Sequence, residues 1–93
     1  MEYKKDGKTY SFALDLDRIL EMEEKDETYS FLDEVSKLGE GKFRVTTLNN
    51  MCKFMGTTYK DYIKTGLTVD DLTDILIECI KEAGFFTETP ESN

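Results

Sequence analysis

Apolar residues recur at spacings of three and four along residues 68–84, so the pattern predicts an α-helix with one continuous apolar stripe. Thr68 can cap the first turn, with Asp71 three residues later in the capping-box position. Gly84 suits the left-handed residue that ends many helices. We expect this helix to form the centre of a small bundle, covered on more than one side. Its apolar residues are Val69, Leu72, Leu76, Cys79, Ile80 and Ala83, with Ile75 and Ile77 widening the stripe.

The N-terminal residues 2–12 follow a different pattern, which predicts a β-hairpin. Asp6-Gly7 favours a type I′ turn, because both of its central residues need positive φ. Tyr10 and Phe12 share one face of the second strand. Because an isolated hairpin is marginal in water, we expect this face to pack on the helices.

Helical periodicity and end signals predict four more helices between the hairpin and the last helix. The first can be capped by Asp15 or Asp17, and the second by Thr28 or Ser30. Val45 begins the apolar face of the third helix. The predicted ranges are Asp15–Lys25, Thr28–Leu38 ended by Gly39, Lys42–Met55 ended by Gly56, and a short Thr58–Thr65 ended by Gly66.

These elements predict a mainly α protein: a small compact bundle of four to five helices with a short N-terminal hairpin. Its length of 93 residues is that of one domain. We expect residues 1–86 to form this domain and residues 87–93, which are polar and contain the only proline, to form a flexible tail. No apolar run approaches the length of a membrane span or a signal peptide.

Charge is unevenly distributed along the chain, whose net charge is −8. Residues 1–41 carry 12 acids and 6 bases, and residues 65–93 carry 7 acids and 1 base, while residues 42–64 carry 5 bases and 1 acid. The overall charge argues against nucleic acid as a partner, because phosphate binding needs concentrated positive charge. We expect the basic segment to pair with the acidic helices on either side, within or between subunits.

Candidate chemistry is sparse. The chain has no histidine, which removes the commonest general base, and it has no phosphate-binding loop or nucleophile elbow. Cys52 and Cys79 fall on apolar helix faces, which predicts buried, reduced thiols rather than metal ligands. We therefore predict a protein that is not an enzyme, with no catalytic residues, no cofactor and no metal.

Aromatic and apolar residues in or near the last two helices are the candidates for partner binding. Phe85 and Phe86 directly follow Gly84, and they either close the helix end or remain exposed as part of an apolar patch. The other candidates lie on the short fourth helix, where neighbouring lysines would give a basic rim: Tyr59, Tyr62 and Ile63.

The order of these elements resembles that of the tail assembly chaperones of long-tailed bacteriophages and gene-transfer-agent-like particles. The similarity covers roughly residues 8–84 and rests on the order and length of the elements rather than on one diagnostic motif. The residues that carry it are Lys8–Phe12, Leu14–Glu23, Phe31–Val35, Tyr59–Tyr62, and Gly66–Leu72 leading to Ala83-Gly84.

The resemblance implies a non-enzymatic protein that binds the phage tape measure protein and assists assembly of the tail tube protein. It implies action in the host cytoplasm and absence from the mature virion, with homo-oligomers and a frameshifted longer form as open possibilities. An acidic bundle of this kind can shield an apolar helix by helix-in-groove packing. The alternative is a small acidic phage or mobile-element module that inhibits or regulates a host protein.

Overall fold

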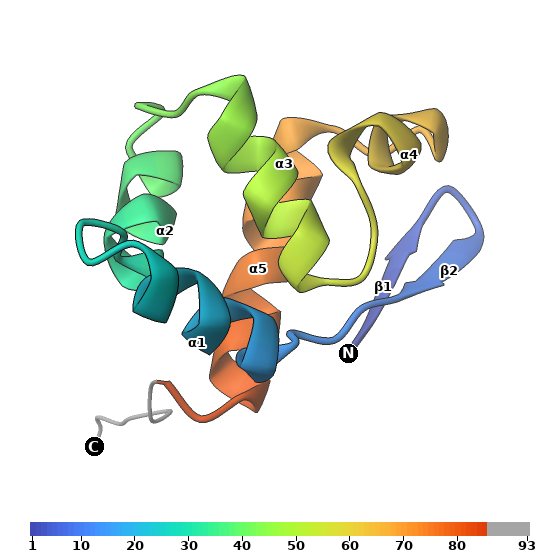
Figure 1. Ribbon diagram of the computed structural model, residues 1–93. Helices are drawn as coiled ribbons and strands as arrows, with labels where there is room; N and C mark the ends of the chain where they lie inside the picture. Colours follow the sequence, from blue (N-terminus) through green and yellow to red (C-terminus); the bar gives the residue numbers. More distant parts are fainter. Residues whose placement is uncertain (86–93) are drawn as a thin grey trace, which may run out of the picture.

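The computed structural model describes residues 1–85. A two-stranded antiparallel hairpin precedes five helices, which confirms the predicted mainly helical bundle (Figure 1). Residue 86 and the predicted tail 87–93 lie outside the described residues. The elements are β1 (Glu2–Lys5), β2 (Lys8–Ser11), α1 (Leu16–Lys25), α2 (Phe31–Gly39), α3 (Val45–Phe54), α4 (Tyr59–Lys64) and α5 (Val69–Glu82).

Helix α5 lies in the middle of the molecule, with the hairpin and α4 at one side and α2 at the other (Figure 1). It begins as predicted: Thr68 Oγ1 accepts a hydrogen bond from the Asp71 N–H (3.2 Å), and Asp71 Oδ2 accepts one from the Thr68 N–H (2.8 Å). Ile75 is buried and Ile77 is exposed, so only the first of them widens the covered face.

The hairpin has the predicted turn and register. Lys5 pairs with Lys8 across the turn, and Asp6 and Gly7 both have positive φ, at 53° and 79°. It is joined to α5 through one carboxylate, because Tyr3 Oη donates to Asp71 Oδ1 and Lys5 Nζ donates to Asp71 Oδ2, each at 2.6 Å. Asp71 is therefore both a helix cap and the anchor of the hairpin.

Helix α2 is shorter at its start than predicted and longer at its end. Asp26 Oδ1 accepts hydrogen bonds from the Thr28 N–H and hydroxyl, at 3.0 and 2.6 Å, which holds Thr28 in a turn, and Ser30 caps the helix instead. The helix ends at Gly39 as predicted, but Gly39 is its last helical residue and does not have the left-handed conformation. Gly41, two residues later, has the left-handed conformation (φ +77°) that turns the chain away from the helix axis.

Helix α3 begins at Val45 rather than at Lys42, because Arg44 stands at the N-cap in an extended conformation, where its N–H donates to Thr47 Oγ1 at 3.4 Å. The prediction that Val45 belongs to the apolar face is wrong: its side chain is 70% exposed. The later residues of this face, Leu48, Cys52 and Met55, are buried as predicted.

Helices α1 and α4 are each preceded by the expected cap. Asp15, rather than Asp17, accepts the first N–H groups of α1, and Thr58 accepts the Asp61 N–H at the start of α4 (3.2 Å). Of the three apolar positions in the stripe of α1, only Ile19 is buried, while Leu16 and Leu20 are exposed. None of the helices within residues 1–85 has both the length and the apolar character that crossing a membrane would require.

Candidate partner-binding surface

An apolar groove opens between α1, α2 and Phe85, the third residue after the end of α5. We call it the leucine groove. Seven large apolar side chains are exposed in the described part of the chain, and four of them line this groove. It encloses about 480 Å³. Its apolar lining comprises Leu16, Ile19 and Leu20 from α1, Phe31 and Leu32 from α2, and Phe85, and its polar lining comprises Glu23 and Ser30.

The spacing of residues in α1 aims one side of that helix at the groove. Leu16, Ile19, Leu20 and Glu23 stand at i, i+3, i+4 and i+7, which share a face. Ile19 points into the core, whereas Leu16 and Leu20 are 46% and 56% exposed at its edge. A helix that keeps two leucines this exposed beside a buried isoleucine has an apolar face only partly covered by its own fold.

The second wall is set by a hydrogen bond between the two helices. Glu23 Oε2 in α1 accepts the N–H of Phe31, the first residue of α2, at 2.9 Å. This bond satisfies one of the N–H groups that a helix start leaves unpaired and places a negative charge at the positive end of the α2 dipole. It also holds Leu32 at the groove, where its side chain is exposed.

Phe85 forms the third wall because of how α5 ends. The Gly84 N–H donates to Lys81 O (3.1 Å) and the Phe85 N–H donates to Ile80 O (3.2 Å), the two bonds of a Schellman motif, with Gly84 at φ +87°. The motif turns the chain so that the Phe85 ring packs on Phe31, with ring centroids 5.7 Å apart. Phe85 nevertheless stays 37% exposed, as expected of a residue at the groove.

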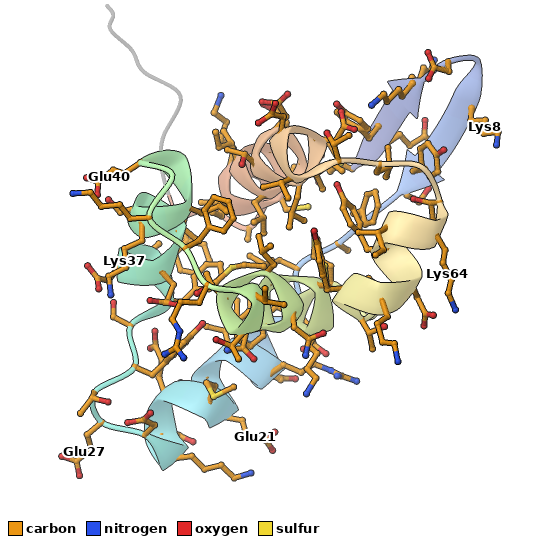
Figure 2. The ribbon with its side chains drawn as sticks, turned by 90° about the horizontal axis from the view of Figure 1, so that it is seen from above. Lys8, Glu21, Glu27, Lys37, Glu40 and Lys64 are labelled. Carbon is orange, nitrogen blue, oxygen red and sulfur yellow. The ribbon has the colours of Figure 1, made fainter. Side chains whose placement is uncertain are left out.

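The basic side chains of α1 lie on a different side of the helix from the leucine groove. No Lys or Arg side chain lines the leucine groove, whose titratable lining residue is Glu23. The bases of α1, Arg18 and Lys25, instead line a smaller hollow beside α3, together with Glu21 and Lys53. Figure 2 shows Glu21 pointing away from the bundle on that helix. The groove is thus apolar with an acidic border.

The three predicted partner-binding residues on α4 differ in how far they are exposed. Tyr62 is buried, with 1% exposure, and its hydroxyl donates to Thr68 O at 2.6 Å, so placing it on a contact surface was wrong. Tyr59 is half-buried and stacks on Tyr62, with ring centroids 6.3 Å apart. Ile63 is exposed. Of the predicted partner-binding residues, Phe85 alone lines the leucine groove, and Phe86 lies outside the described residues.

The α4 surface lies away from the groove. Figure 2 shows Lys64 on α4 at the opposite side of the molecule from Glu27, in the connection between α1 and α2. Within residues 1–85 the basic segment 42–64 forms no ion pair with the acidic helices, so the expected pairing inside one subunit is wrong, and pairing between subunits stays a prediction. The ion pair that this segment forms there joins Lys64 to Asp61 at 3.9 Å, inside the same segment.

Leu16, Leu20 and Leu32 are the site residues that the sequence did not identify. Each follows a helical period, and the same period is typical of a core residue. No local signal distinguishes them, because the four large apolar residues in α1 and the four in α2 are the number that an amphipathic helix of this length normally carries.

Cys52 and Cys79 are free and buried. Burial raises the pKa of Cys52 to about 11 and also raises the pKa of Cys79. Within residues 1–85 no three Cys, His, Asp or Glu side chains cluster as metal ligands do.

Compared with known proteins, the chain matches no protein-family model, no curated protein and no solved structure.

Proposed function

We propose that this protein is a non-enzymatic assembly chaperone of a phage tail, which holds an apolar helix of the tape measure protein in the leucine groove while the tail tube protein assembles. Two things support the proposal. One is the resemblance in element order described above. The other, which carries most weight, is the concentration of exposed apolar side chains in one groove, the kind of surface in which an amphipathic helix can bind.

The size of the groove suits side chains of a helix laid across it. Its volume of about 480 Å³ leaves room for several large side chains of a partner. Covering each half-exposed leucine would contribute about 1 kcal/mol, half of what full burial contributes. Contacts to three leucines and Phe85 add up to a modest binding energy, so the partner can dissociate readily. A chaperone that is absent from the mature particle needs such reversible binding.

The test is co-expression with the long coiled-coil tape measure protein that the proposed function requires as partner. We expect the wild-type chain to keep that protein soluble and to co-purify with it. Leu20→Asp, at the groove, should weaken binding at least tenfold, because it removes apolar burial and adds a charge to be desolvated. Ile63→Asp is the matched control, since it makes the same kind of change at an exposed apolar residue of α4, outside the groove.

Two outcomes would contradict the proposal in different ways. If the wild-type chain leaves the coiled-coil protein insoluble, the chaperone function is wrong. If Ile63→Asp abolishes binding and Leu20→Asp does not, the function stands and the binding surface is α4.

A further inference from the structure

The acidic border of the leucine groove determines which helix fits it. Leu20 is the most exposed leucine of the groove, and Asp17 and Glu24 stand three residues before it and four after it on α1. That spacing places both carboxylates beside Leu20, along the border of the apolar face. Both are exposed, and neither forms an ion pair within residues 1–85.

The cations of α1 do not neutralise this border. Arg18 forms an ion pair with Asp15 (3.2 Å), and Arg18 and Lys25 both line the hollow on the α3 side. An occupant of the groove therefore meets carboxylates beside Leu20 and meets Glu23 at its lining.

We propose that the occupant is a single amphipathic helix that carries lysine or arginine residues along the borders of its apolar stripe. This inference rests on the proposed function and adds the chemistry of the partner segment. Apolar side chains at i, i+3 or i+4, and i+7 enter the groove, while the flanking cations face Asp17 and Glu24. A second copy of this chain is a poor occupant, because it would bring an acidic border against an acidic border on a protein of net charge −8.

Two synthetic peptides test the inference directly. Both have about 18 residues, or five turns, and the same leucine stripe, and they differ in having Lys or Glu at the flanking positions. Fluorescence anisotropy with the wild-type protein should show the Lys-flanked peptide binding at least about tenfold more tightly at low salt. The ratio should shrink as salt rises, because the Debye length falls from about 30 Å at 0.01 M to about 8 Å at 0.15 M.

A pair of charge reversals on α1 provides the matched control. Glu24→Lys and Glu21→Lys change the net charge equally, but Glu24 borders the groove and Glu21 lines the hollow on the α3 side. We expect Glu24→Lys to lower the affinity for the Lys-flanked peptide several-fold. Glu21→Lys should change that affinity less than about twofold. Equal effects of the two reversals would mean that only net charge acts, and would overturn the inference.

Other outcomes separate the inference from the proposed function. If both peptides bind equally, the acidic border does not select the partner, and the inference fails although the groove still binds a helix. If neither binds, the inference also fails, while co-expression reports on the chaperone function independently. A dimer in sedimentation that Leu20→Asp dissociates would show that a second copy fills the groove, and would overturn the inference as well.

Discussion

At the scale of single residues, Asp71 has the largest structural role of any charged side chain in the described part of the chain. Its carboxylate accepts hydrogen bonds from Lys5 and Tyr3 in the hairpin and from the N–H and hydroxyl of Thr68. These bonds, that of Lys5 first, hold the pKa of Asp71 well below its usual range. The bond from Tyr3 to Asp71 in turn raises the pKa of Tyr3 to about 12.

We expect Asp71→Asn to lower the free energy of unfolding at pH 7 by roughly 1.5–3 kcal/mol, the range for hydrogen bonds to a charged group. Because the folded pKa is depressed, the contribution of Asp71 is present above the unfolded pKa of about 3.9 and is lost as the pH falls below it. Urea melts should therefore show that the free energy of unfolding falls less between pH 7 and pH 3 for the variant than for the wild type.

Asp70→Asn is the control for this prediction, since it removes the same charge from the neighbouring, exposed position in the first turn of α5. It should cost only about 0.3–1 kcal/mol through the helix dipole. Equal losses for the two variants would mean that the hairpin bonds contribute nothing.

Tyr29 is the residue whose polar group the fold leaves unsatisfied. Its hydroxyl oxygen is buried without a hydrogen-bond partner among the described residues, while its ring packs edge-on against Phe54 (centroids 6.3 Å apart). Burial raises the pKa of Tyr29. Tyr29→Phe should therefore be neutral or stabilise the protein by about 1 kcal/mol.

Tyr62→Phe provides the contrast, because that hydroxyl donates to Thr68 O, and we expect a loss of about 1 kcal/mol. Thermal or urea unfolding of both variants measures the difference. A clear loss on Tyr29→Phe would show that its hydroxyl is bonded in solution.

At the scale of elements, α5 carries the core. Leu72, Ile75 and Leu76 are fully buried within it, and Ile80 is nearly so. The two ends of this helix contact different parts of the molecule. The start joins the hairpin through Asp71, and the end delivers Phe85 to the leucine groove through the Schellman motif.

Leu76→Ala should lower the free energy of unfolding by about 2–5 kcal/mol, because the fully buried side chain leaves a cavity. Ile77→Ala is a control in the next position, where the side chain is 41% exposed, and it should cost less than about 1.5 kcal/mol. Denaturant melts of the two variants check this, and a loss below about 1 kcal/mol for Leu76→Ala would place the stripe at the surface.

At the scale of the whole molecule, the core and the leucine groove are built from the same helices. Ile19 and Phe31 belong to the buried core and also line the groove, so the groove floor is continuous with the interior. Substitutions at those two residues would change folding and binding together. The exposed leucines at the edge are therefore the residues on which binding can be tested without unfolding the protein.

The reactivity of the two thiols reports on opening of the whole core. Because Cys52 and Cys79 are buried and their pKa values are raised, we expect a thiol reagent at pH 8 to label them at least about 100-fold more slowly in native buffer than in urea. Leu76→Ala should accelerate labelling, since it increases the population of open forms. Rapid labelling of both thiols in the native wild type would place them at the surface.

The sequence by itself determined the features that depend on neighbours in the chain. The Asp6-Gly7 turn, the capping box of Thr68 with Asp71, and the stop at Gly84 are formed by groups within a few residues of one another. The sequence predicted less well where two local signals competed, as at Gly39 and Gly41.

Only the tertiary structure decided which apolar residues are covered. A helical period shows that Leu16, Ile19 and Leu20 share a face, but burial depends on which element packs there, and the fold buries only Ile19 of the three. For the same reason Tyr62, predicted at a binding surface, is enclosed beneath the N-terminal end of α5. The groove exists only where the consecutive helices α1 and α2 meet Phe85, which lies far from both in the sequence, so no local pattern could specify it.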